Sequence, residues 1–182
     1  MFAWVVIRED NSDVLASAVA RAWTGGAAVA HLEIPNKKAG KPPRRIAVIE
    51  LAHGTRAKRA PRWPDVLGEW SDINEEALFP VGELPVLAEE LSALGALSLC
   101  VYAGPGFTPA TVAWYEKGAL VGFEHAGGTP VIWDADGGLG RPLAGATGET
   151  QIAFALKKVL DQEPPPLDEL AGTVATTPKR AT

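Results

Sequence analysis

The chain has 182 residues, a formal net charge of -5 and 47% hydrophobic residues, which exclude a disordered chain and predict one globular domain that buries its own core. Its single cysteine excludes an intramolecular disulfide and any metal or iron–sulfur site built from several cysteines. The mildly acidic charge excludes a surface that is basic throughout, as expected of a general nucleic-acid binder.

The stretch at 2–8 is rich in β-branched and aromatic residues and is predicted to be the first strand. Its apolar run ends at Arg8, too early for a secretory signal, and no later run reaches the roughly 20 apolar residues of a membrane helix. We therefore expect a protein of the cytoplasm that makes no membrane contact and keeps Cys100 reduced.

Helical and extended patterns follow along the chain. Apolar residues from Val14 to Trp23 recur at helical spacing, and Gly25 and Gly26 end that helix. The strand at 46–52 is apolar almost throughout, which predicts burial on both faces. The remaining expected elements are strands at 27–34, 97–103, 111–115, 120–124 and 130–133, and helices at 85–94 and 149–161.

This order of elements predicts an α+β fold. Several strands follow one another without a helix between them, which favours a mixed, mostly antiparallel sheet of about seven strands with about three helices packed on it. We place this single globular domain at 1–162. Three prolines at 164–166 then end the last helix, and the sequence beyond them has no period, so 163–182 is predicted to be a flexible tail. Within it, Leu167 and Leu170 offer apolar contacts to the domain or to a partner.

The small net charge hides two blocks of opposite sign. Between residues 36 and 64, Glu50 alone opposes the basic residues Lys37, Lys38, Lys41, Arg44, Arg45, Arg56, Lys58, Arg59 and Arg62. Between residues 65 and 90 there is no Lys or Arg, and the acids are Asp65, Glu69, Asp72, Glu75, Glu76, Glu83, Glu89 and Glu90. Like charges this dense repel one another unless something compensates them.

Two structural interpretations account for the blocks: they face and partly neutralise each other, or the basic side chains are solvated on loops that flank the strand at 46–52. The functional interpretation is that the basic loops at 37–62 bind an acidic protein partner, with a phosphate, another anion or a nucleic acid as the alternative ligand. Trp63 and Trp70 are candidate anchors, because Trp and Arg are common at binding hot spots. The predicted binding residues are Arg44, Arg45, Arg56, Lys58, Arg59, Arg62, Trp63 and Trp70.

A short string after the strand at 46–52 is the candidate for chemistry. His53 offers a base, Thr55 a hydroxyl donor and Arg56 an anion clamp, at a strand end where ligands often bind. A small enzyme centred on His53 is therefore the second alternative. The structural interpretation of the same string is a loop with a half-buried histidine.

Other reactive residues are expected to be structural. The histidines have no metal-ligand spacing, no cofactor is predicted, and Cys100 lies in an apolar run typical of an inert, buried thiol. The adjacent carboxylates Glu75 and Glu76, and likewise Glu89 and Glu90, point apart on a helix and are expected on solvated faces. Four tryptophans in regular elements are expected in the core: Trp4, Trp23, Trp114 and Trp133.

The sequence thus favours a non-catalytic protein-interaction module, such as an immunity, adaptor or regulatory protein. Its predicted binding surface is the charge-segregated segment at 36–80. Abundant Ala, Gly and Pro are typical of GC-rich bacterial genomes, which indicates a bacterial source. The pattern does not indicate an oligomeric state.

Overall fold

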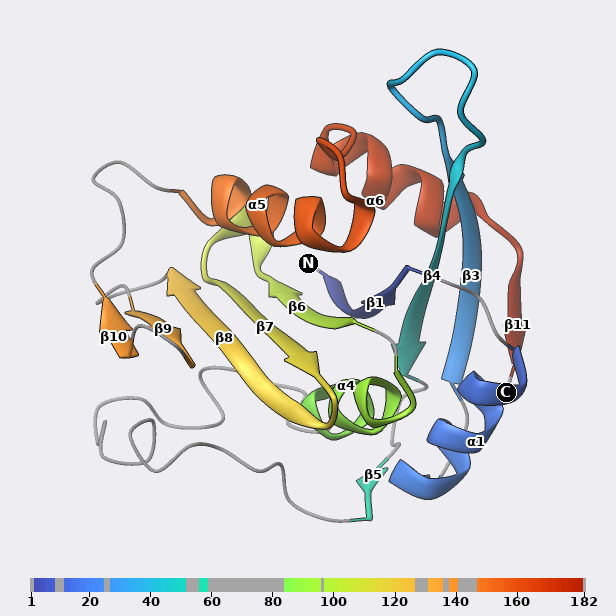
Figure 1. The fold of residues 1–182 in the computed structure, drawn as a ribbon, viewed down its shortest axis with the longest axis vertical. Coiled ribbons are helices and arrows are strands. Elements are labelled where there is room, and N and C mark those ends of the chain that lie inside the picture. The colour runs from blue at the N-terminus through green and yellow to red at the C-terminus, as the bar shows by residue number, and fades with distance from the viewer. Residues whose placement is uncertain are drawn as a thin grey trace.

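A computed structural model of the chain shows one nine-stranded sheet in which all pairings are antiparallel (Figure 1). The structure describes residues 2–8, 12–24, 27–51, 56–58, 84–95, 97–126, 131–135, 138–140 and 147–181. The strand order is β10-β9-β8-β7-β6-β1-β4-β3-β11. These strands are β1 (Phe2–Ile7), β3 (Ala27–Ile34), β4 (Arg44–Leu51), β6 (Ser98–Ala103), β7 (Ala110–Glu116), β8 (Ala119–Ala126), β9 (Val131–Asp134), β10 (Gly138–Gly140) and β11 (Lys179–Ala181).

Helices cover both faces of this sheet. One apolar cluster lies between the sheet and the helices α1 (Ser12–Ala22) and α4 (Leu84–Ala93). A second lies between the opposite face and the helices α5 (Gly148–Leu160) and α6 (Leu167–Thr176). The predicted single α+β domain with a mostly antiparallel sheet is confirmed. Among the described helices, none is long and apolar enough to cross a membrane.

The strand expected at 46–52 is buried on both faces, as predicted. Ile46 and Val48 face α5 and α6, while Ala47 and Ile49 face α1 and α4, and all four are fully buried. Successive side chains of a strand point to opposite faces, so a strand between two helical layers needs a continuous apolar run. The run therefore marks β4 as a central strand.

Short elements depart most from expectation. The first helix ends at Ala22, and Trp23 begins β2 (Trp23–Thr24), which pairs with β5 (Arg56–Ala57). A 3-10 turn, η1 (Pro105–Phe107), joins β6 to β7. β10, at Gly138–Gly140, pairs with β9 and extends the sheet beyond the strands expected from the sequence.

The prediction of a flexible tail at 163–182 is wrong. After the prolines the chain forms α6 and then β11, which pairs with β3, so the domain continues to residue 181. Leu167, Leu170 and Val174 are buried against the sheet. Their spacing of three and four residues places them on one face of the helix. α5 ends at Leu160 with Asp161 as a left-handed C-cap, before the first proline, and Pro166 is the N-cap of α6. The expectation that Leu167 and Leu170 contact the domain is confirmed.

Alanine substitutions at two glycines of α5 and α6 are expected to change the free energy of unfolding in opposite directions. A Cβ built on Gly148 lies 1.9 Å from the backbone carbonyl oxygen of Phe107, so Gly148→Ala forces a backbone shift that costs about 1–3 kcal/mol. A Cβ on Gly172, inside α6, meets nothing within 4 Å, and Gly172→Ala is expected to add about 0.5–1 kcal/mol. Urea unfolding of the two variants measures both effects, and the same sign for both contradicts this packing.

Because α6 packs on the sheet through an apolar stripe, truncating a side chain of that stripe is expected to lower stability. Leu170→Ala should lower the free energy of unfolding by about 2–5 kcal/mol, because it leaves a cavity against the sheet. Glu169→Ala, on the exposed side of the same turn, is the matched control and should stay within about 0.5 kcal/mol of the unchanged chain. Equal unfolding midpoints for the two variants would mean that α6 does not contribute to the fold.

Candidate functional site

The structure describes the side chains of Arg44, Arg45 and Lys58 among the predicted binding residues. Arg56 lies in β5. The remaining candidates lie outside the described residues: Arg59, Arg62, Trp63 and Trp70 of the predicted surface, and His53 and Thr55 of the candidate anion site. The site can therefore be built from the first part of the basic block.

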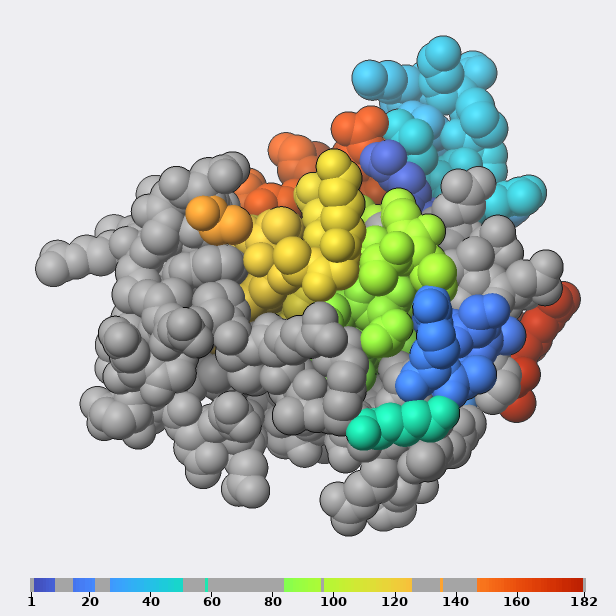
Figure 2. All heavy atoms as spheres, turned by 60° about the horizontal axis from the view of Figure 1, so that its bottom comes forward, coloured from blue at the N-terminus to red at the C-terminus, as the bar shows by residue number. Residues whose placement is uncertain are grey.

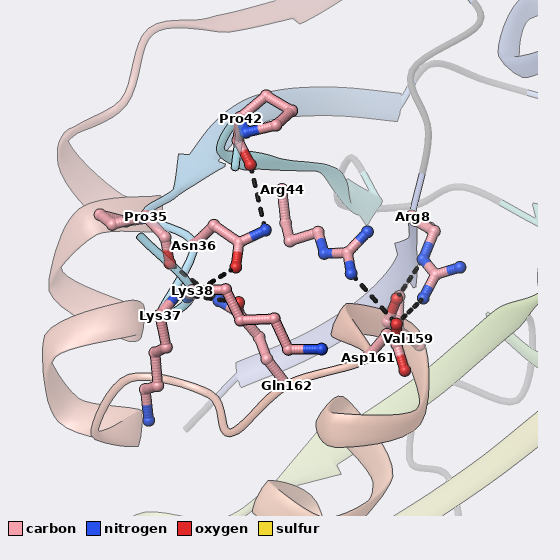
Figure 3. Close-up of polar contacts among 10 residues, drawn as sticks. All are labelled: Arg8, Pro35, Asn36, Lys37, Lys38, Pro42, Arg44, Val159, Asp161 and Gln162. Carbon is pink, nitrogen blue, oxygen red and sulfur yellow. Dashed lines mark hydrogen bonds and ion pairs between the residues drawn. The ribbon is translucent and has the colours of Figure 1, made fainter. Parts of the chain in front are cut away.

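Arg44 begins β4 and contacts the C-terminal end of α5. Its Nη2 donates to Asp161 Oδ2 at 3.0 Å, and Arg8 Nη2 lies 4.0 Å from the same oxygen (Figure 3). Arg8 Nε also donates to the carbonyl oxygen of Val159 at 2.8 Å. A helix C-terminus carries partial negative charge and carbonyls without helical partners, so two guanidinium groups stabilise it. Arg44 is therefore engaged in a contact between β4 and the end of α5, which makes it a poorer candidate for binding than the sequence suggested.

Arg45 points to the other side of the sheet and remains more accessible. Its Nη2 lies 3.0 Å from Oε1 of Glu33, the residue opposite it on β3. The two side chains are 69% and 59% exposed, and an exposed pair of this kind contributes only about 0–1 kcal/mol. Arg45 can therefore exchange Glu33 for an acid of a partner at little cost. Lys58 donates to the carbonyl oxygen of Ala20 at the end of α1.

The loop between β3 and β4, residues 35–43, is called the basic loop below. It stands away from the body of the molecule as the uppermost cyan segment in Figure 2. Gln162, just beyond α5, holds one side of its base: Nε2 donates to the carbonyl oxygen of Pro35 at 2.9 Å, and Oε1 accepts from the Lys37 N–H at 3.3 Å. The loop is thereby tied to the helical layer (Figure 3).

Asn36 closes the basic loop from within. Its Nδ2 donates to the carbonyl oxygen of Pro42 at 3.2 Å, and its Oδ1 accepts from the Lys38 N–H at 3.0 Å. At the tip, the Lys41 N–H donates to the Lys38 carbonyl oxygen at 3.2 Å, and Gly40 has the φ of 77° that this turn requires. The loop has a defined conformation because its backbone groups are bonded internally.

The lysines Lys37, Lys38 and Lys41 are exposed on this loop. Lys37 lies near Glu163, whose pKa is lowered mainly by a hydrogen bond from Lys157 and further by the charges of Lys157 and Lys37. In the described part of the chain no ion pair engages Lys38 or Lys41. All three belonged to the predicted basic block but not to the predicted binding residues. The signal that could have selected them is the proline- and glycine-containing string around them.

Parts of both charge blocks lie within the described residues. Arg44 and Arg45 pair with Asp161 and Glu33, which both lie outside the acidic block. Within that block, Glu89 is only 4% exposed, and Glu90 lies 3.8 Å from Arg21 of α1. The expectation of a solvated face at Glu89 and Glu90 is wrong, because α4 is covered by α1 as well as by the sheet.

Reactive groups elsewhere have structural surroundings. Cys100 is fully buried, and desolvation raises the pKa of its thiol well above the ordinary value, which keeps it protonated and inert, as predicted. His125 is buried, and its Nδ1 is hydrogen-bonded to Oγ1 of Thr111 at 2.8 Å. Within the described ranges, no three His, Cys, Asp or Glu side chains come close enough to hold a metal ion. Trp4 and Trp114 are buried, as predicted.

A carboxylate on the side of the sheet that α5 covers also has a perturbed pKa. Glu124 of β8 is 8% exposed, and desolvation raises its pKa while the charge of Lys158 opposes the rise. The Lys158 ammonium lies 3.7 Å from the ring centroid of Trp114 and 5.3 Å from that of Phe154, so it is held by cation–π contacts. Sequence reasoning missed this group because its members are spread over three elements.

The raised pKa of Glu124 predicts that this residue destabilises the folded state at the pH values where its carboxyl group is ionised. Because the native state holds its proton more tightly than the unfolded chain does, stability falls as pH rises from the unfolded pKa, about 4.3, through the raised native pKa. Glu124→Gln is therefore expected to be more stable than the unchanged chain at pH 7 and to lose that advantage below about pH 4. Unfolding midpoints over this pH range measure the difference. Glu116→Gln, at an exposed site, controls for the loss of one charge, and a pH-independent advantage of Glu124→Gln would contradict the assignment.

Comparison with known proteins assigns no family: no family model, curated protein or solved structure gives a significant match to the chain.

Proposed function

We propose that this chain is a non-catalytic protein-binding module, of the immunity, adaptor or regulatory kind, whose partner presents acidic groups to the basic loop. The observation that carries the proposal is the set of exposed lysines on a loop whose base is bonded to Gln162 and Asn36. A loop that is already ordered loses less conformational entropy when it binds, so its charges contribute more to affinity.

The surroundings of the basic loop favour an acidic protein over a nucleic acid. Glu33, Asp161 and Glu163 are exposed near its base, interspersed with the basic residues. A nucleic-acid backbone is anionic along its whole length and would meet these carboxylates as well as the lysines. A protein surface can place its acids opposite the lysines alone, and such complementarity sets partner choice and association rate.

Other predictions from the sequence remain predictions. The segment of the proposed surface from residue 59 to residue 80 lies outside the described residues, as does His53, on which the enzyme alternative rests. A cytoplasmic location and a bacterial source rest on the sequence alone. The basic loop is therefore the part of the surface on which a test can be built.

The test is capture of a partner from a lysate of the source organism by the tagged full chain. The double variant Lys38→Glu with Lys41→Glu should lose a stoichiometric partner, because both lysines are exposed and reversing them puts like charges against its acids. The matched control is Lys117→Glu, an exposed lysine on the turn between β7 and β8, which should retain the partner. Titrating the captured pair should show at least a tenfold loss of affinity for the double variant.

Two results would contradict the proposal. If the double variant retains the partner at full affinity, the basic loop does not carry binding, and the reversal of Arg56, Lys58, Arg59 and Arg62 then tests the rest of the basic block. If the chain instead binds mixed oligonucleotides with an affinity that falls steeply as salt rises, the nucleic-acid alternative takes the place of a protein partner.

A further inference from the structure

We propose that the aromatic site at Trp114, where α5 lies over β7 and β8, binds a methylated ammonium group, and that Lys158 competes with this ligand from within the chain. The site is separate from the basic loop, so the inference does not rest on the proposed function. It is carried by two aromatic rings and a buried carboxylate, which lie around the Lys158 ammonium.

The Lys158 ammonium marks the position of the site. α5 packs over β7 and β8, and the Lys158 side chain reaches from the helix to the ring of Trp114 on β7 (Figure 1). Its Nζ lies 3.7 Å from the centroid of that ring and 5.3 Å from the centroid of Phe154, one turn earlier on α5. An aromatic face attracts a cation within about 6 Å. The two rings therefore form two walls around one cation position.

A buried acid adds negative charge beside the rings. Glu124 of β8 is paired with Val112 of β7, which shares a sheet face with Trp114, so Glu124 faces α5 as Trp114 does. It is 8% exposed, and among the described residues no hydrogen bond or ion pair engages its carboxylate. The charge of Lys158 acts on it and opposes the rise in its pKa. Because a buried carboxylate is costly without a counter-charge, a cation held at the rings also stabilises Glu124.

The cation that the site already holds indicates which ligand can compete. A free primary amine presents the same group as Lys158, which is tethered beside the rings and has the higher effective concentration. A methylated ammonium is less strongly hydrated, and its methyl groups pack on aromatic faces, which is how proteins recognise quaternary ammonium ligands. The class of ligand that fits is therefore a methylated ammonium, as in choline or a trimethylated lysine side chain.

The entrance to the site is formed by side chains at the surface. Phe154 is 54% exposed and Lys158 is exposed, whereas Trp114 is 6% exposed. Since the Lys158 ammonium lies over the Trp114 ring, rotation of this flexible side chain into solvent uncovers the ring without a change in the core. A ligand can therefore reach the site by replacing one surface side chain.

The experiment titrates the full chain with choline and with its uncharged carbon isostere, in which a tert-butyl group replaces the trimethylammonium group. Binding is followed by the amide and indole N–H resonances. We expect choline to shift the indole resonance of Trp114 and to bind Lys158→Ala about tenfold more tightly than the unchanged chain, because this variant lacks the competing ammonium. The isostere should bind Lys158→Ala at least about tenfold more weakly than choline does.

Two further variants test the walls and the charge of the site. Lys157→Ala removes an exposed lysine from the same turn and is the matched control, so its affinity for choline should equal that of the unchanged chain. Glu124→Gln in the Lys158→Ala chain should weaken choline binding by about tenfold, because the carboxylate no longer balances the ligand's charge. Phe154→Ala, at an exposed position, should also weaken it.

The outcomes decide between a cation site and its alternatives. Equal binding of choline and the isostere to Lys158→Ala overturns the proposal, because the site then recognises apolar surface alone. Equal affinity of Lys158→Ala and Lys157→Ala for choline overturns the competition by Lys158. Absence of binding to all variants overturns the site itself. Titration with capped trimethyllysine separates two sources of the ligand: tighter binding than choline assigns a side chain of another protein, and weaker binding assigns a free small cation, and either result supports the site.

Discussion

The position of α5 depends on its buried apolar face, and two arginines contact the C-terminal end of this helix. Arg8 follows β1 and Arg44 begins β4, and both reach the last turn of a helix that is more than 100 residues away from them in sequence. The guanidinium groups contact carbonyl and carboxylate oxygens at the negative end of the helix, and they add to the burial of its apolar face on β6, β7 and β8, which holds α5 on the sheet. Gln162 follows directly, so the same contact sets where the basic loop is held.

Most of the sheet could be predicted from the sequence because its strands are locally distinctive. The run that forms β4 is apolar on both faces, and the segments of β7 and β8 flank a Lys-Gly turn. The elements that escaped prediction are too short or too weakly apolar to show a period. β10 and β11 have three residues each, and α6 has three buried side chains, Leu167, Leu170 and Val174, among Ala, Thr and Gly. Their places are decided by tertiary packing, which a local pattern does not record.

The candidate site was predictable as a region but not as a set of residues. The basic block includes the basic loop, but it could not tell which of its cations make ion pairs within the fold. Arg44 and Arg45 are neighbours in sequence, and strand alternation sends one to Asp161 at the end of α5 and the other to an exposed pair with Glu33. Since Asp161 lies 117 positions from Arg44, no spacing rule could have found it. A count of basic residues therefore overstates the charge that is available to a partner.

On this surface the arginines make fixed contacts within the fold and the loop lysines are exposed, in keeping with the chemistry of the two side chains. The planar guanidinium group of Arg8 contacts a carbonyl and a carboxylate at once, which suits a fixed contact between layers. Lysine carries a single, strongly hydrated charge on a flexible side chain, and the lysines of the basic loop are exposed. Because Lys38 and Lys41 contribute only backbone groups to the described bonds of the loop, their side chains can change without loosening it. Substitutions of these two lysines can therefore change the charge of the basic loop while Gln162 and Asn36 keep its backbone bonds.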